Sequence, residues 1–140
     1  MCELACTSVE GIGSRDETTL LRGNYQPLAP YLERLDVPQL VLEYATERAG
    51  DLLDFKGKEL GLGIVNPRSD VVESSTAIRE MIERALRIYQ PEQLFLNPDC
   101  GFGTFATRPM NSPDVAAAKL RAMVAAAREL RGDSVSSPRR

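Results

Sequence analysis

The stretch from Leu94 to Gly101, Leu-Phe-Leu-Asn-Pro-Asp-Cys-Gly, is the part of the sequence that decides the fold. Its apolar start predicts a short buried strand, and the Asn-Pro-Asp-Cys-Gly that follows predicts a tight turn. The turn presents a carboxylate, Asp99, and a thiol, Cys100, at the carboxyl end of the strand. Barrels and open α/β sheets carry their catalytic residues at this end. A thiol there is a candidate metal ligand or nucleophile, because only the thiolate is reactive and a turn can expose it.

Two further apolar runs bring the number of expected strands to three. The runs cover Gln39–Tyr44, Leu60–Val65 and Gln93–Leu96. Each run is nearly continuous in apolar residues, which is typical of a parallel sheet covered on both faces. Helical patterns stand between the runs, and this alternation predicts βαβ crossovers. The expected fold class is therefore α/β, with parallel strands alternating with helices.

Four helical segments accompany these strands. A short helix is expected over 28–35, and one or two helical turns over 51–56. A third helix begins after Ser74, and the last begins after Ser112 and stops at Gly132, because serine caps a helix start and glycine a helix end. The residues expected to face inward on the last helix are Ala116, Leu120, Met123, Val124, Ala127 and Leu130.

The length of the chain limits how much of a barrel it can hold. A complete (β/α)8 barrel needs about 250 residues, and this chain has 140. A free-standing three-stranded parallel sheet would leave unpaired backbone groups at both edges. We therefore expect either a piece of a larger barrel or a chain that completes its sheet with a partner.

Composition argues against several classes of partner and mechanism. The net charge of −3 gives no broad basic face for nucleic acid, and no apolar run approaches the length of a membrane helix. The first six residues lack the regions of a signal peptide, so we expect a cytoplasmic location with the three cysteines reduced. The chain contains no histidine, which removes the commonest general base and the commonest zinc ligand.

Each candidate residue also has a plainer interpretation. Glu43 lies inside the first apolar run, where a carboxylate is costly unless it is paired or bound to a metal. It therefore either reaches solvent or an arginine such as Arg48, or binds a metal or substrate. Cys100 is either an inert buried thiol or, because turn residues surround it, an accessible ligand. Asp99 is, on the plainer interpretation, a turn former, and the loop Arg68–Asp70 is either an ordinary polar loop or an active-site loop of a barrel.

In this order, these residues resemble one known family. Residues 96–104, Leu-Asn-Pro-Asp-Cys-Gly-Phe-Gly-Thr, resemble the terminal zinc-ligand motif of cobalamin-independent methionine synthases. Residues 42–51 resemble that family's glutamate-ligand strand, and residues 61–69 resemble its next strand and loop. The expected organisation is an irregular N-terminus at 1–19, a partial methionine-synthase-like barrel domain at 20–131 and a flexible tail at 132–140.

The resemblance implies a fold, a metal and a reaction. The fold is the C-terminal part of a TIM (β/α)8 barrel of the uroporphyrinogen-decarboxylase and methionine-synthase type. The family binds zinc through one histidine, two cysteines and one glutamate. By this resemblance Glu43 and Cys100 are metal ligands, and Asp99 is a catalytic-site residue that orients the turn or a ligand. Zinc holds the thiol of homocysteine as a thiolate, which takes a methyl group from a folate-type donor to give methionine.

The sequence departs from the family's pattern at the first two zinc ligands. His-x-Cys should stand just before Arg22-Gly23-Asn24, but Thr19 and Leu21 occupy these positions, and leucine cannot bind zinc. Cys2 and Cys6 are weak substitutes, because a lone cysteine pair is a poor metal signal. We interpret the chain as a truncated or metal-impaired methyltransferase, whose own activity is left open. The alternatives are a non-catalytic barrel remnant or binding module, and a subunit that completes its site as a homo-oligomer or with a partner barrel fragment.

Overall fold

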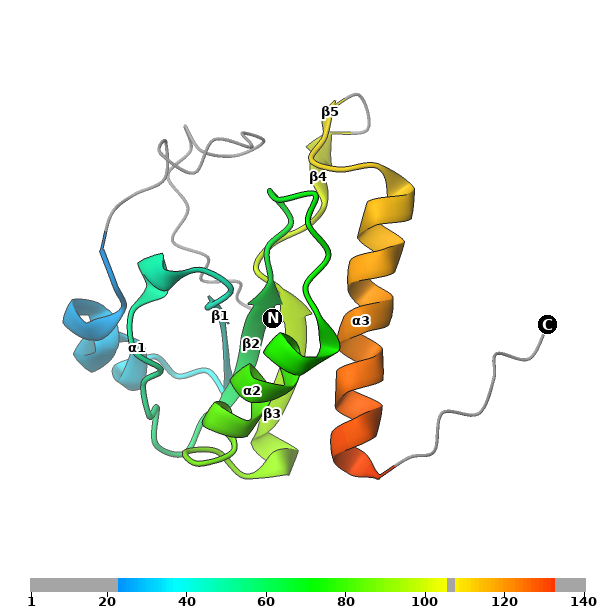
Figure 1. Cartoon of the computed structure of the whole chain (residues 1–140). Coiled ribbons are helices and arrows are strands. Elements are labelled where there is room, and N and C mark those ends of the chain that lie inside the picture. The colour runs from blue at the N-terminus through cyan, green and yellow to red at the C-terminus, as the bar shows by residue number, and fades with distance from the viewer. Residues whose placement is uncertain (1–22, 106–107, 133–140) are drawn as a thin grey trace.

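The computed structural model of the chain describes residues 23–105 and 108–132 and is built on a three-stranded parallel sheet. The strands are β1 (Gln39–Glu43), β2 (Glu59–Val65) and β3 (Leu94–Pro98), in the order β1-β2-β3. Figure 1 shows α2 (Ser75–Ala85) and α3 (Pro113–Arg131) beside this sheet, where both pack against β2 and against each other. The three expected strands and their parallel pairing are confirmed.

The smaller elements surround this unit. A short helix, α1, precedes β1 as expected. A two-stranded antiparallel sheet, β4 with β5, follows β3 along the chain and lies next to the start of α3 (Figure 1). Three short 3-10 helices occupy connections. The bounds are α1 (Ala29–Arg34), β4 (Gly103–Phe105), β5 (Arg108–Pro109), η3 (Gln26–Leu28), η4 (Glu47–Ala49) and η5 (Pro91–Gln93).

The predicted helical turns over residues 51–56 are wrong. This segment holds no helix, and the nearest helical element is η4. Tyr89 supplies the reason, because its hydroxyl accepts a hydrogen bond from Phe55 N–H at 3.0 Å and donates one to Leu53 O at 2.6 Å. The backbone groups that a helix would use are thus satisfied by a residue more than thirty positions away.

The core lies between the sheet and the two long helices. Leu40 and Leu42 of β1 stand beside Leu60 and Leu62 of β2, and all four side chains are at most 1% exposed. Burying one such leucine stabilises the fold by about 1.5–3 kcal/mol. The buried residues that α2 and α3 add to this cluster are Ile78, Ile82, Ala85, Met123 and Ala126.

The opposite face of β2 is formed by two glycines. A Cβ on Gly61 would lie 2.9 Å from Cγ2 of Val41, and a Cβ on Gly63 would lie 2.4 Å from Oδ1 of Asp99. Side chains from β1 and from the end of β3 therefore close over β2 on this face, and only glycine leaves room for them. This close approach brings the ends of β1 and β3 together.

Both long helices begin where the sequence predicts. The Ser74 hydroxyl accepts from Ala77 N–H at 3.2 Å, and the Ser112 hydroxyl accepts from Val115 N–H at 3.3 Å. Gly132 ends α3 in the left-handed conformation, with φ of 72°. Local capping chemistry therefore fixes these helix boundaries.

The predicted inward face of α3 is wrong in part. Leu120 and Val124 are 39% and 44% exposed, whereas Lys119 is fully buried. The Lys119 ammonium donates to the carbonyl of Val71 and, at 2.9 Å, to Oε2 of Glu73. A lysine with two oxygen partners can be buried. The buried face of α3 therefore includes Lys119, and the helix is rotated relative to the face that its apolar residues alone predict. The buried residues of α3 are Lys119, Met123 and Ala126.

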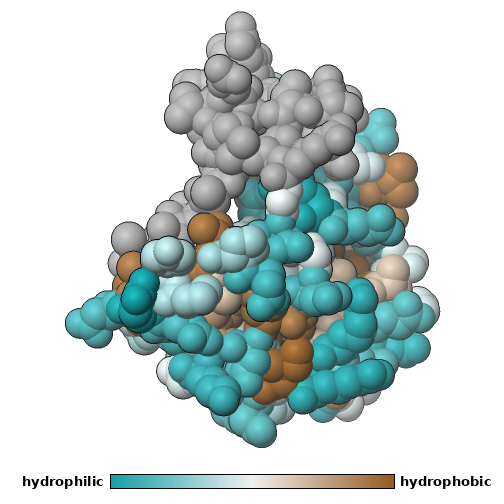
Figure 2. Space-filling view, turned by 90° about the vertical axis from the view of Figure 1, so that its left-hand side faces the viewer, coloured by the Kyte–Doolittle hydropathy of each residue, from teal (hydrophilic) through white to brown (hydrophobic). Residues whose placement is uncertain are grey.

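The surface on the α1 side is mostly hydrophilic. Figure 2 shows polar side chains over most of this face, with apolar side chains gathered near its centre. Within residues 23–105 and 108–132, none of the helices combines the length and the apolar character that crossing a membrane requires.

Candidate functional site

Glu43 ends β1 as a buried carboxylate. The residue is 4% exposed, and Nη2 of Arg48 forms an ion pair with its Oε2. Its backbone N–H donates to the Tyr25 hydroxyl at 3.0 Å, and no signal in the sequence had pointed to Tyr25. The other carboxylate oxygen, Oε1, is buried and has no hydrogen-bond partner among the described residues. The carboxylate thus has the arginine partner that the sequence suggested, and it also keeps one oxygen free for a ligand.

Asp99 joins the ends of the two outer strands. Its Oδ1 accepts hydrogen bonds from Tyr44 N–H at 3.0 Å and Ala45 N–H at 2.9 Å, just after β1. Its own N–H donates to the carbonyl of Val65 at 2.9 Å, at the end of β2. One residue therefore connects the ends of all three strands. Its side chain holds the backbone after Glu43 in place relative to the turn that carries Cys100.

Burial makes the Asp99 carboxyl less acidic than usual. Removal from water raises its pKa to about 7, the Ala45 N–H lowers it, and the charge of Glu43 raises it further. The residue is only 6% exposed, so desolvation of the charged form dominates. Near neutral pH this carboxyl is therefore divided between its protonated and ionised forms.

Cys100 is a free, half-buried thiol beside these groups. Burial raises the pKa of Cys100, the Arg68 guanidinium lowers it, and the charges of Glu43 and Asp99 raise it. Arg68 comes from the loop after β2 and is 5% exposed. The structure thus brings Glu43, Asp99 and Cys100 together at the carboxyl end of the sheet. It also places the buried Arg68 beside them, from the loop for which the sequence had left two interpretations.

A dedicated set of hydrogen bonds supports the Arg68 loop. Asn66 N–H donates to Glu73 Oε1 at 2.9 Å, and Asn66 Oδ1 accepts from Arg68 N–H at 2.9 Å. From the segment just before α3, the Asn111 amide donates to the carbonyl of Ser69 at 2.9 Å and to that of Pro67. These contacts fix the backbone that carries Arg68, and its guanidinium lies close enough to the Cys100 thiol to lower the pKa of that thiol.

The described residues do not form a complete zinc site. They contain no group of three cysteine, histidine, aspartate or glutamate side chains that could hold a metal ion. Glu43 offers the free Oε1 and Cys100 offers its sulfur, but Oδ1 of Asp99 is occupied by two backbone N–H groups. A catalytic zinc ion takes three ligands from the protein. The positions Thr19 and Leu21, and the cysteines at 2 and 6, lie outside the described residues.

Comparison with known proteins identifies the family. The family model described as the catalytic domain of cobalamin-independent synthase matches residues 21–129. The chain belongs to this family. The match starts and ends within two residues of the 20–131 region that the sequence motifs had marked as similar.

The relatives of this cobalamin-independent synthase domain are much longer than the chain. Methionine synthase of Pyrococcus furiosus is 36% identical over 98 residues, 67% of the chain and 29% of that protein. Methionine synthase of Pyrococcus abyssi is 34% identical over 128 residues, 89% of the chain and 36% of that protein. The 5-methyltetrahydropteroyltriglutamate–homocysteine methyltransferase of Bacillus licheniformis is 31% identical over 134 residues, 92% of the chain and 16% of that protein. The chain therefore spans about a third or less of these curated relatives.

A solved structure supports the fold of this domain. The B12-independent methionine synthase of Shewanella sp. W3-18-1, determined in complex with selenomethionine, superimposes with a TM-score of 0.67 at 22% identity. The superposition covers 78% of the chain and 31% of that structure. The expected fold, part of a barrel with parallel strands alternating with helices, is confirmed.

Proposed function

We propose that this chain is the part of a homocysteine methyltransferase barrel that brings a glutamate and a cysteine to a zinc ion. The free, buried Oε1 of Glu43 carries the proposal. A buried carboxylate oxygen without a partner is costly, and a cation that binds there removes the cost. Cys100 lies in the turn after β3, at the same end of the sheet, and offers the second donor.

The substrates of this proposal come from the names of the relatives. Homocysteine is the proposed thiol acceptor, and a methyltetrahydropteroyl-type folate is the proposed methyl donor, as in the name of the Bacillus licheniformis relative. Cytoplasm is the proposed location, because the role needs reduced thiols. Two protein donors do not hold zinc tightly, so we expect the chain to bind zinc weakly and to methylate homocysteine only when further donors complete the site.

Asp99 serves this site as a positioning residue in our proposal. Its two hydrogen bonds from the N–H groups of Tyr44 and Ala45 fix the backbone directly after Glu43. The next residue along the chain is Cys100. A single side chain thereby sets the separation of the two proposed ligands, although it donates no atom to the metal itself.

A second candidate is a subunit that obtains the missing donors from a partner. The edges of the sheet favour it, because β1 and β3 each pair with only one strand in the described part of the chain. Unpaired edges of a parallel sheet recruit further strands. Light scattering separates the candidates: a partner-completed site predicts an assembly larger than one chain, and a monomer refutes completion by a second copy.

Elemental analysis of the purified full chain tests the zinc proposal. We expect zinc well below one ion per chain after dialysis, and weak binding that decreases in both Cys100→Ala and Glu43→Gln. Glu33→Gln, an exposed glutamate on α1, is the matched control. One tightly held zinc per chain that is lost in Cys100→Ala would contradict the incomplete site. Binding that neither substitution weakens would contradict the assignment of the two ligands.

A further inference from the structure

A pocket lies on the side of the sheet that α2 covers. Tyr44, the residue after β1, forms part of its wall together with Met81 and Arg84 of α2. The pocket has a volume of about 660 Å³ and lies between α2 and the segment that follows β1. That segment contains only η4 and no α-helix before β2, so no crossover helix covers this side of α2.

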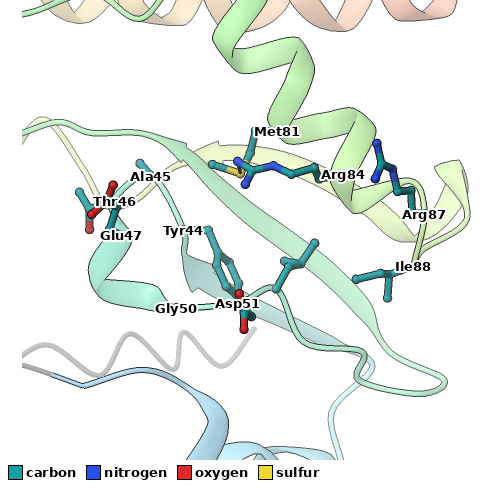
Figure 3. A pocket seen from close by; sticks show the side chains of 11 residues that line it. Tyr44, Ala45, Thr46, Glu47, Gly50, Asp51, Met81, Arg84, Arg87 and Ile88 are labelled. Atoms are coloured by element: carbon teal, nitrogen blue, oxygen red, sulfur yellow. Dashed lines mark hydrogen bonds between the residues drawn. The ribbon is translucent and has the colours of Figure 1, made fainter.

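The two walls of the pocket carry opposite charges. Figure 3 shows Arg84 and Arg87 on the α2 side, and Glu47 and Asp51 on the segment that follows β1. Neither arginine forms an ion pair with a carboxylate among the described residues. The ion pairs in this part of the chain are Arg48–Glu43, Arg79–Glu83 and Lys119–Glu73. Nη2 of Arg84 donates instead to Sδ of Met81 at 3.2 Å, which directs the guanidinium along the pocket wall.

The ring of Tyr44 forms part of the wall between the charged groups. Tyr44 is 5% exposed, and its ring centroid lies 5.4 Å from that of Tyr25. Burial raises the pKa of Tyr44, and the nearby backbone of Leu53 lowers it. The hydroxyl is buried, so Tyr44 offers the pocket its ring surface.

Apolar side chains line the space between the charged walls. Leu52, Met81 and Ile88 face the pocket together with the ring of Tyr44. The volume of about 660 Å³ equals that of roughly twenty water molecules at about 30 Å³ each. A ligand of this size has about as many non-hydrogen atoms as a di- or tripeptide.

We propose that this pocket binds a zwitterionic ligand with an apolar middle, of the class of a short apolar peptide with both termini free. The carboxylate of the peptide pairs with Arg84 and Arg87, and its ammonium group pairs with Asp51 and Glu47. The apolar side chains of the peptide lie on Leu52, Met81, Ile88 and the ring of Tyr44. This inference does not rest on the proposed function, because its charged residues, Arg84, Arg87, Glu47 and Asp51, are not among the proposed zinc ligands.

Calorimetric titration of the full chain tests the proposal, with L-leucyl-L-leucine as the probe. N-acetyl-leucyl-leucine lacks the ammonium group, and leucyl-leucine amide lacks the carboxylate. We expect each of these compounds to bind at least about tenfold more weakly than the zwitterion, because each loses a charge-assisted contact. Equal affinity for all three compounds, or no binding of the zwitterion at millimolar concentration, overturns the proposal.

Exposed residues supply matched variants that leave the core intact. Double substitution of Arg84→Gln and Arg87→Gln, and separately Asp51→Asn, should each weaken binding of the dipeptide at least about tenfold. Arg128→Gln, an exposed arginine on α3, is the control and should bind like the unaltered chain. Unchanged binding in both pocket variants overturns the proposal.

Discussion

Replacing Asp99 by asparagine changes how the stability of the chain depends on pH. The Asp99 Oδ1 accepts two backbone N–H groups, and an asparagine side-chain oxygen can accept the same two bonds. Asp99→Asn therefore keeps the connection between the strand ends and removes only the buried charge. The unaltered carboxyl must ionise in a site where burial raises its pKa from 3.8 to about 7.

The magnitude and sign follow from these two pKa values. Between pH 4 and pH 7 the unfolded chain has lost the Asp99 proton and the folded chain still holds it, so stability falls as the pH rises. Each pH unit in this window costs about 1.4 kcal/mol, so the total loss is about 4 kcal/mol above pH 7. The stability that this loss removes is fully present below pH 4, where the Asp99 carboxyl is protonated in both the folded and the unfolded chain. Asp99→Asn should lack the loss and be more stable than the unaltered chain above pH 7, by up to about 4 kcal/mol.

Urea unfolding from pH 4 to pH 8.5 measures this difference. The quantity to follow is the free energy of unfolding of Asp99→Asn minus that of the unaltered chain, which cancels the titration of other groups. Asp36→Asn, an exposed position just before β1, is the control for the change from aspartate to asparagine. A difference for Asp99→Asn that does not change with pH, or a variant that is less stable than the unaltered chain at pH 8, would refute the argument.

Two further comparisons test the packing around the site by urea unfolding. Gly63→Ala should cost about 1–3 kcal/mol, because its Cβ would lie 2.4 Å from the Asp99 oxygen. Gly57→Ala, with φ of 74° and open space around it, should cost only about 1 kcal/mol of backbone strain, so a larger loss at Gly57 contradicts the account. Glu73→Gln should cost about 3 kcal/mol, because it leaves the fully buried Lys119 ammonium without its carboxylate. Lys119→Met should cost less, since the Glu73 side chain is 22% exposed and water can solvate it, and the opposite order would contradict this.

Local patterns in the sequence were enough to predict the framework. Continuous apolar runs gave the three parallel strands, and the capping residues Ser74 and Ser112 gave the starts of the two long helices. These features depend on residues close together in the chain. The expected turn over Asn97–Gly101 was wrong in part, because Asn97 and Pro98 belong to β3, where they pair with β2, and the chain bends only at Asp99 and Cys100.

Long-range contacts caused the failures. The backbone at 53–55 is held by Tyr89, and the rotation of α3 is set by the Lys119 contacts with the segment before α2. The hydrogen bonds of Asp99 join residues 54 and 55 positions apart, so its contacts with the β1 end could not be derived from the motif. For Glu43 the sequence left two alternatives, an ion pair with Arg48 or a bound ligand. In the structure Oε2 pairs with Arg48, and Oε1 has no hydrogen-bond partner among the described residues.

The central claim is that Glu43 and Cys100 bind the same metal ion. Calorimetric zinc titration of the full chain, of Glu43→Gln, of Cys100→Ala and of the double variant tests it as a double-mutant cycle. If both side chains hold one ion, each single substitution weakens binding, and the second substitution costs much less than it does alone. The claim would be contradicted if the losses of zinc-binding free energy in the two single variants simply add in the double variant, or if zinc affinity is unchanged in every variant.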